Sequence, residues 1–327
     1  MDAQATTVDM ADIEAAAERL HGQIRRTSFI ESPVLNQQFG GRILFKPECL
    51  QRTGSFKFRG AYNRISQFTA EERQRGIVAF SSGNHAQGVA SSAALFGIKA
   101  VIVMPKDAPE AKIASTRAYG AEVVFFDRYT EKRETVAAPF VERGMVLVPP
   151  FDDPHIIAGQ GTIGLEIVRE AAAEGLVIDD LFAPAGGGGL ISGVSVAVKA
   201  HSPATRIWGA EPEHFDDLRR SLIAGRIVAN DAGRRSICDA ILTPQPGNLT
   251  FPINARNLSG AIAVSDDAVR EAMRLAARHL KLVVEPGGSV GLAALASGEV
   301  DIKGRTAVVV LSGGNVDLAE YGALLAA

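Results

Sequence analysis

The sequence predicts an α/β fold in two domains, each an open, mostly parallel, twisted sheet flanked by helices. The chain has 327 residues, which is more than a single hydrophobic core usually supports. From residue 76 onward, short apolar runs alternate with helical stretches, as is typical of βαβ units in a parallel sheet. Glycine-rich segments follow three of the expected strands, and ligands bind beyond the carboxyl ends of such strands. A ligand-binding cleft between two lobes is therefore expected.

The first regular block spans residues 76–153 and is expected to form the small domain, which closes over the cleft. Its apolar runs and helical stretches alternate along the chain. The expected strands are 77–80, 100–104, 122–126 and 146–148, and the expected helices are 85–96, 109–118 and 131–143. This alternation predicts a parallel sheet.

Residues 1–66 and 155–327 are expected to form the large domain. Its predicted helices are 9–21, 156–173, 190–200 and 266–280, and its predicted strands are 43–45, 180–183, 206–210 and 306–311. Ser265 is expected to cap the helix that follows it. The segment 227–260 contains three prolines and few periodic apolar positions, so we expect irregular structure there, near the cleft.

The composition excludes several classes of partner. The formal net charge is −3 with no long basic run, so the chain has no electrostatic footprint for nucleic acid or for an anionic membrane. The two cysteines, Cys49 and Cys238, share no metal-ligand or redox spacing, and free buried thiols in a reducing compartment are expected. The N-terminus is unlike a signal peptide, and no run of about 20 apolar residues is present. A cytoplasmic location is expected.

Four consecutive glycines, at 186–189, lie between an apolar strand and a helix. Glycines leave backbone N–H groups accessible and a helix N-terminus favours an anion, so the segment predicts a phosphate-binding loop. It fits neither a P-loop, whose Lys-Ser/Thr pair is missing, nor the dinucleotide fingerprint, because Ile191 stands where a glycine is required. Nucleotide chemistry is therefore not expected.

Two further segments carry groups suited to catalysis. Lys57 is flanked by Phe56 and Phe58, an environment that can desolvate an amine and lower its pKa for Schiff-base chemistry. A solvated surface lysine is the alternative. The segment 81–88 (SSGNHAQG) gathers hydroxyl, amide and imidazole groups at the start of a helix, where they can bind a carboxylate or serve only as a helix cap.

Together these segments resemble one family along nearly the whole chain. The family is that of the fold-type-II pyridoxal-phosphate enzymes, with a tryptophan synthase β-like fold, and specifically its serine/threonine dehydratase and serine racemase group. The motifs that carry the resemblance are SFKFRGA at 55–61, SSGNHAQG at 81–88, AGQGT at 158–162, GGGGL at 186–190, AEP at 210–212, EPGG at 285–288 and LSGGNVD at 311–317. The resemblance implies pyridoxal 5'-phosphate as cofactor, a small amino acid as substrate and a homodimer.

The resemblance also implies which residues hold the cofactor. Lys57 would carry it and act as the base at Cα, and Phe56 would pack beside its ring. Asn84 would hydrogen-bond the ring hydroxyl. Ser312 would meet the pyridine nitrogen, and because a hydroxyl does not stabilise a protonated ring, prompt β-elimination is favoured. The phosphate would be held by the backbone amides of Gly186, Gly187, Gly188, Gly189 and Leu190.

For the substrate, the resemblance leaves alternatives open. Ser81, Ser82, Asn84 and His85 are expected to bind the substrate carboxylate. Ser82 also matches the acid/base that serine racemases place on the ring face opposite the lysine. Arg133 matches an arginine that in racemase-like and hydroxyaspartate-processing relatives can reach a second carboxylate, although a solvated helix face with local ion pairing is the other interpretation.

Glu211, the carbonyl of Phe215 and Asp217 match the family's divalent-cation site, where oxygen ligands suit Mg²⁺ or Ca²⁺. An ordinary acidic helix start is the alternative. The pair Asp239-Ala240 stands where many relatives have Asp-Gly, so an extra methyl is expected to narrow the pocket. The effector domain that follows this motif in feedback-inhibited threonine dehydratases is not found after residues 311–317, and we therefore expect a catabolic or broad-specificity enzyme.

We therefore expect a dehydratase that removes water and ammonia from a small β-hydroxy amino acid, such as L-threonine or L-serine, and leaves a 2-keto acid. Serine racemisation and dehydration of threo-3-hydroxyaspartate are the alternatives at the same site. A non-catalytic amino-acid-binding protein on this scaffold would be marked by loss of the lysine, and Lys57 is present.

Overall fold

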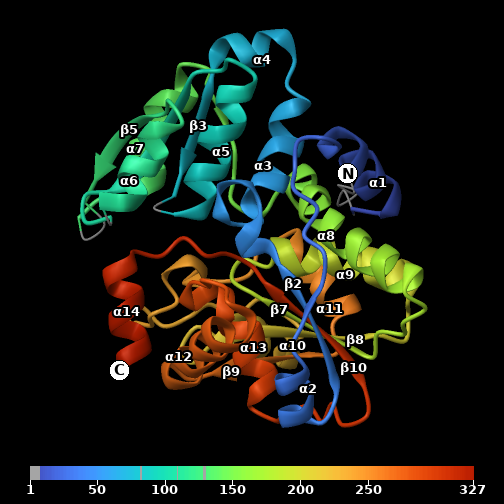
Figure 1. The fold of residues 1–327 in the computed structure, drawn as a ribbon. Helices are drawn as coiled ribbons and strands as arrows, with labels where there is room; N and C mark the ends of the chain where they lie inside the picture. Colours follow the sequence, from blue (N-terminus) through green and yellow to red (C-terminus); the bar gives the residue numbers. More distant parts are fainter. Residues whose placement is uncertain (1–7, 82, 109, 128–129) are drawn as a thin grey trace.

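The computed structural model describes residues 8–81, 83–108, 110–127 and 130–327, and it contains two sheets (Figure 1). One sheet has the strand order β1-β2-β10-β7-β8-β9, and the other has the order β5-β4-β3-β6. Among the described strands, neighbours run parallel except for β1 and β2. The predicted α/β, mostly parallel fold class is confirmed. We call the sheets with their helices the six-stranded lobe and the four-stranded lobe.

The elements have the following bounds. The strands are β1 (Ile30–Glu31), β2 (Arg42–Pro47), β3 (Ile77–Phe80), β4 (Ala100–Pro105), β5 (Glu122–Phe126), β6 (Val146–Leu147), β7 (Asp180–Pro184), β8 (Arg206–Pro212), β9 (Gly260–Val264) and β10 (Thr306–Leu311). The helices are α1 (Met10–Leu20), α2 (Pro33–Phe39), α3 (Lys57–Ser66), α4 (Ala70–Arg75), α5 (Asn84–Leu95), α6 (Glu110–Ala118), α7 (Arg133–Glu142), α8 (Pro154–Ala173), α9 (Gly189–His201), α10 (Asp217–Ala224), α11 (Thr250–Asn257), α12 (Asp266–Leu275), α13 (Pro286–Ala296) and α14 (Leu318–Ala326). The short turns are η1 (Glu48–Leu50), η2 (Arg52–Gly54), η3 (Asp239–Ile241) and the π-helical η4 (Ala276–Leu280).

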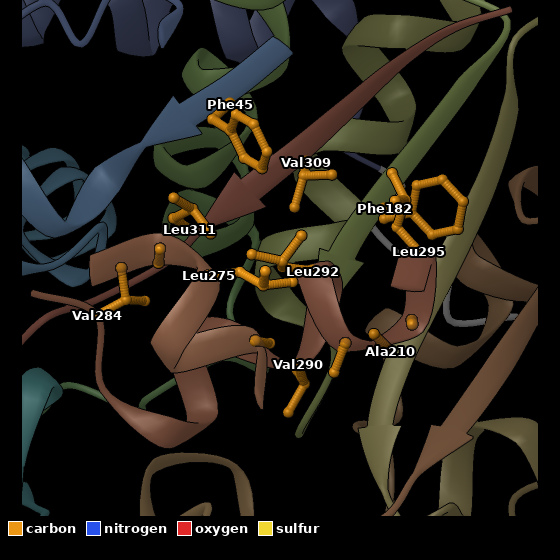
Figure 2. Packing of buried hydrophobic residues seen from close by; sticks show 14 of the residues in the cluster. Phe45, Phe182, Ala210, Leu275, Val284, Val290, Leu292, Leu295, Val309 and Leu311 are labelled. Carbon is orange, nitrogen blue, oxygen red and sulfur yellow. The ribbon is translucent and has the colours of Figure 1, made fainter. Parts of the chain in front are cut away.

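Helices cover both faces of the six-stranded sheet. On one face, α13 packs on β7 and β10, and Figure 2 shows Leu292 and Leu295 gathered there with Phe182 and Val309. On the other face, α1, α8 and α9 pack together. Alternate residues of β10 enter the two cores, since successive strand side chains point to opposite faces. Burial on both faces explains why β10 is a continuous apolar run.

The four-stranded sheet is also covered on both faces. Helix α5 packs on β3 and β4 in one core, while α7 packs on the same strands in another. Helix α3 contacts α8 of the six-stranded lobe and α5 of the four-stranded lobe (Figure 1). The four strands lie within residues 76–153, and the other six lie within 1–66 and 155–327. The predicted domain boundaries themselves stay a prediction.

Most predicted elements occur within a few residues of their expected bounds, but two expectations were wrong or incomplete, and several elements were not predicted. The segment 227–260 is not wholly irregular, because it contains η3 and α11. Pro252 lies in the first turn of α11, where the missing N–H would have no partner within the helix. The helix expected at 266–280 becomes π-helical at Ala276. Helix α13 was not predicted, because its burial on all sides leaves no amphipathic periodicity.

Smaller expectations were confirmed. Ser265 caps α12, since its hydroxyl accepts a hydrogen bond from the amide of Ala268 at 3.2 Å. Cys49 and Cys238 are free and buried. None of the described helices is long and apolar enough to cross a membrane.

Candidate active site

A pocket lies between the lobes, beyond the carboxyl ends of β3, β7 and β10. Phe80 ends β3, Pro184 ends β7 and Ser312 follows β10, and all three line the pocket. The structure brings together here every predicted cofactor- and substrate-binding residue that it describes. These are Phe56, Lys57, Ser81, Asn84, His85, Arg133, Gly186, Gly187, Gly188, Gly189, Leu190 and Ser312. The predicted acid/base Ser82 lies outside the described residues.

Lys57 is the first residue of α3, and the chain before it is fixed to the segment that follows β10. The amide of Phe56 donates to the carbonyl of Ser312 at 3.1 Å. Ser55 forms an isolated bridge with Gly313. These contacts hold Lys57 beside the end of β10, although more than half of the chain separates the two segments in sequence.

The Lys57 amine is partly desolvated within the pocket. Its Nζ donates to the carbonyl of Pro150 at 2.8 Å and lies 5.2 Å from the centroid of the Phe56 ring. Burial lowers the pKa of Lys57 to about 8, against a smaller opposing effect of the Glu285 carboxylate. The amine therefore reaches its neutral form near physiological pH, which a nucleophile or base requires.

A buried ion network anchors α3 just beyond Lys57. The Arg59 guanidinium pairs with Glu48 at 2.8 Å and with Glu166 at 2.7 Å, and Lys46 pairs with Glu166 at 2.6 Å. Arg59, Lys46 and Glu48 are fully buried, so removing one partner would leave an uncompensated charge under the helix. Sequence reasoning missed this network, because its members are far apart in the chain.

The four glycines at 186–189 form the turn from β7 into α9. Gly188 has a φ of +91°, which favours glycine, and a side chain at Gly187 would overlap the ring of Phe151. The carbonyl of Gly187 accepts a hydrogen bond from the Thr250 hydroxyl at 2.7 Å. Within the described residues, the N–H groups of the four glycines have no hydrogen-bond acceptor. They form a set of donors at a helix N-terminus, which suits a phosphate.

The start of α5 supplies the predicted carboxylate-binding groups. The His85 Nε2 lies 2.9 Å from the carbonyl of Val148. Burial and the charge of Lys57 lower the pKa of His85 to about 3, so the ring is neutral and Nε2 carries the proton that the carbonyl accepts. Only the main-chain N–H of His85 is then left as a donor for a ligand. The Ser81 hydroxyl accepts from the amide of Gly83 at 3.1 Å and can still donate its hydrogen.

Two cationic side chains from the four-stranded lobe line the same pocket. Arg133, the first residue of α7, lies over the Phe80 ring at 4.6 Å, pairs with the adjacent Glu134 at 2.8 Å and is 42% exposed. Lys112 on α6 forms an ion pair with Asp239 on η3, across the gap between the lobes. Burial opposes the charge of Lys112, but Asp239 more than compensates, and the pKa of Lys112 is raised.

The predicted cation ligands lie away from the pocket. Glu211 is fully buried, and its carboxylate accepts from the amides of Leu218 and Arg219, each at 2.9 Å. Asp217 accepts from the Asn230 amide at 2.5 Å, while its Oδ2 has no hydrogen-bond partner among the described residues. The described part of the chain contains no cluster of three or more His, Cys, Asp or Glu placed to hold a metal.

Comparison with known proteins identifies the family. The sequence profile described as "Pyridoxal-phosphate dependent enzyme" matches residues 20–313. The chain belongs to this family. It is 45% identical to the L-threo-3-hydroxyaspartate ammonia-lyase of a Pseudomonas species, over 96% of this chain and 97% of that protein.

Two solved structures of the family are similar to this fold. The T.th. threonine deaminase superposes with a TM-score of 0.88 at 45% identity, over 95% of this chain and 99% of its own. Maize serine racemase superposes with a TM-score of 0.91 at 36% identity, over 97% and 96%. The cofactor of the family is pyridoxal phosphate, and this pocket fits it, because it joins a partly desolvated lysine with a loop of unpartnered N–H groups.

Sequence reasoning missed two charged groups that line the pocket. Glu285 is buried, and burial with the nearby charge of Asp239 raises its pKa to about 7. The motif EPGG contained this residue, but its spacing assigned it no role. Lys112 carried no signal, because one lysine in a short charged helix is most often solvated.

Proposed function

We propose that the chain is a pyridoxal-phosphate-dependent ammonia-lyase whose substrate is L-threo-3-hydroxyaspartate, a β-hydroxy amino acid with a second carboxylate. The reaction breaks the Cα–H and Cβ–O bonds and releases water. The enamine that results takes up water and loses ammonia, which leaves a 2-keto acid. The position of Arg133 in the pocket carries this proposal. The name of the Pseudomonas relative supports it.

Arg133 offers the second carboxylate a partner that L-threonine and L-serine would not use. Among the described residues, its contacts are an adjacent exposed carboxylate and a ring face, and an exposed pair of this kind is weak. A guanidinium binds a carboxylate through two parallel hydrogen bonds. Lys112 on the same wall is already paired with Asp239, so Arg133 is the charge that favours a dianionic substrate over a monocarboxylate with an apolar or hydrogen side chain.

We assign the chemistry to Lys57. When bound, pyridoxal phosphate supplies the electron sink that makes the Cα hydrogen acidic. The neutral Nζ of Lys57 takes that proton, and its pKa of about 8 makes the neutral form accessible. The Ser312 hydroxyl would face the ring nitrogen, and the N–H groups of Gly186–Leu190 would hold the phosphate. The Ser81 hydroxyl and the N–H groups that begin α5 would hold the α-carboxylate.

The test compares substrates for the holoenzyme and one variant. Arg133→Gln is expected to lower kcat/KM for L-threo-3-hydroxyaspartate by about 10- to 100-fold, since a hydrogen bond to a charged group contributes about 1.5–3 kcal/mol. The value for L-serine should stay within about two-fold. Arg143→Gln is the control, because Arg143 also lies on an aromatic ring of α7, Phe140, at 4.6 Å but does not line the pocket.

Two outcomes would overturn the substrate assignment. One is a wild-type kcat/KM that is higher for L-threonine or L-serine than for the hydroxyaspartate. The other is an equal loss for all three substrates in Arg133→Gln. The same assays, extended to chiral analysis, measure D-serine formed from L-serine, and accumulation of D-serine faster than pyruvate would make racemisation the main activity.

We also propose a divalent cation, Mg²⁺ or Ca²⁺, held by Glu211, the Phe215 carbonyl and Asp217. The unpartnered, buried Oδ2 of Asp217 supports it, since an oxygen ligand can satisfy a hard cation there. Mg²⁺ added to chelator-treated holoenzyme should raise Tm, and Glu211→Gln should abolish the increase. A wild-type Tm that neither cation changes would exclude the site.

We propose a homodimer from the family resemblance, and a cytoplasmic location from the composition. Sedimentation of the holoenzyme tests the homodimer.

A further inference from the structure

We infer that Glu285 and Asn315 are positioning residues that fix the side-chain amide of Asn84, so that an N–H of Asn84 is presented to the ring hydroxyl of the cofactor. The inference rests on the proposed role of Asn84 toward pyridoxal phosphate. Asn84 and Glu285 line the pocket, whereas Asn315 is not among the lining residues and acts from behind. We call these three residues the amide clamp.

Three hydrogen bonds define the amide clamp. Asn84 Nδ2 donates to Glu285 Oε1 at 2.5 Å. Asn84 Oδ1 accepts from Asn315 Nδ2 at 2.8 Å. Asn315 Nδ2 also donates to the carbonyl of Thr53 at 2.7 Å. Asn84 is 7% exposed and Glu285 is 2% exposed, so water does not compete freely for these groups.

The contacts determine which way the Asn84 amide faces. The carbonyl of Thr53 can only accept, so it requires the Nδ2 of Asn315 on its side, and that nitrogen in turn requires an oxygen from Asn84. An ionised Glu285 accepts only, so it requires the Nδ2 of Asn84. The Thr53 end therefore selects one orientation, and the Glu285 end selects the same orientation when its carboxyl, whose pKa is about 7, is ionised. Nδ2 retains a second hydrogen, and this is the donor left for a ring oxygen.

Two glycines make room for the amide clamp. A side chain at Gly313 would overlap Glu285 Oε1 and crowd Asn84 Nδ2, and a side chain at Gly54 would overlap the Asn315 amide. Gly54 also has a φ of +73°, which favours glycine. The backbone at Gly54 and at Gly313, which are distant in sequence, thus leaves space for the side chains of the amide clamp.

The amide clamp also gives a role to two motif residues, Glu285 and Asn315, that had none before. Glu285 comes from EPGG, Asn315 from LSGGNVD, and Asn84 from the motif at 81–88. The three residues belong to both lobes, since α5 is part of the four-stranded lobe while Glu285 and Asn315 follow elements of the six-stranded lobe. The orientation of Asn84 is therefore set by the six-stranded lobe, against which it is held.

The experiment uses purified apoprotein titrated with pyridoxal phosphate in the absence of substrate. Asn315→Asp replaces the donor to Asn84 with an acceptor, which should turn the Asn84 amide and remove its N–H from the ring oxygen. We expect the dissociation constant of pyridoxal phosphate to rise about tenfold, the loss of roughly one hydrogen bond, with a shift of the visible absorption maximum. Asn84→Ala should change the dissociation constant and the absorption maximum by similar amounts.

The double variant separates positioning from a general structural effect. If Asn315 acts through Asn84, adding Asn315→Asp to Asn84→Ala should change the dissociation constant by less than about two-fold. Additive effects, or an Asn315→Asp protein with wild-type affinity and absorption maximum, would overturn the inference. Asn257→Asp is the control, since Asn257 is a buried amide that donates to Ser195 at 3.1 Å and does not line the pocket.

Two further points keep the test decisive. If Asn315→Asp does not fold, Asn315→Ser removes the donor without adding charge, and the same non-additivity with Asn84→Ala is expected. Because no substrate is present, a wrong substrate assignment leaves these results unchanged. Conversely, loss of the amide clamp would leave the preference between L-threo-3-hydroxyaspartate and L-serine as it is in the wild type.

Discussion

The floor and the mouth of the pocket are built differently. The floor consists of groups fixed by buried hydrogen bonds, as in the amide clamp and at the carbonyl of Gly187. The mouth carries the Arg133 and Asp239 side chains, which are 42% and 50% exposed, and Lys112, which is 12% exposed and pairs with Asp239. A buried polar group cannot change partners without a large free-energy cost, whereas an exposed ion pair can. The floor is thus suited to one cofactor, and the mouth is where substrate preference can vary.

The largest effect is expected at the floor, where Gly187→Ala should weaken the binding of pyridoxal phosphate. The new methyl would overlap the ring of Phe151, and overpacking of this kind costs about 1–3 kcal/mol. Titration of the apoprotein should show affinity for pyridoxal phosphate falling by about 10- to 100-fold. Phe151→Leu in the same chain should restore part of it. Gly322→Ala, where a methyl meets nothing nearby, is the control, and an equal loss there would mean that the loop geometry is not responsible.

A second prediction concerns the pH dependence of cofactor capture at the floor. Burial lowers the pKa of Lys57 to about 8, and only the neutral amine attacks a carbonyl carbon. The neutral fraction therefore rises about tenfold between pH 7 and pH 9 and then levels off. Stopped-flow absorbance of apoprotein mixed with pyridoxal phosphate measures this rate. A rate still rising above pH 10, as expected for a free lysine, would show that the amine is not desolvated.

The smallest effect is expected at the mouth. Lys112→Gln breaks the ion pair with Asp239 between the lobes. Because the Asp239 side chain is 50% exposed, water can solvate the carboxylate that is left, and we expect a loss of about 1 kcal/mol. Steady-state kinetics should show KM for L-threo-3-hydroxyaspartate rising about two- to five-fold, with unchanged affinity for the cofactor. Lys99→Gln breaks an exposed pair with Glu122 within one lobe and should leave both constants unchanged. A loss of cofactor affinity in Lys112→Gln would erase the distinction between mouth and floor.

The fold could be predicted largely from sequence because its strands are short apolar runs between helices and glycine turns. The prediction failed where burial on all sides removes periodicity, as in α13, and where prolines occupy a position that a helix tolerates, as in α11. The two failures have different causes. Local patterns report a contrast between a buried and an exposed face, and α13 presents little such contrast. Helix α11 does have a buried face, but Thr250, Asn254 and Asn257 on that face are polar, so hydrophobic periodicity does not reveal it.

The parts of the candidate site that depend on local backbone conformation could be predicted from sequence motifs. The glycine loop and the segment around Lys57 carry such signals. Glu285 and Lys112 do not, because their importance comes from partners far away in the chain, Asn84 in one case and Asp239 in the other. Sequence spacing does not reveal contacts of this kind.

The position of β10 has a consequence for how the chain is made. This strand is last in sequence among the described strands, yet it lies between β2 and β7 near the middle of the six-stranded sheet. During synthesis, β2 and β7 have no partner between them until β10 has left the ribosome. The cofactor site, which needs Ser312 beside Lys57, therefore cannot form until β10 and the residues after it have been made, by which time the four-stranded sheet is already available to fold.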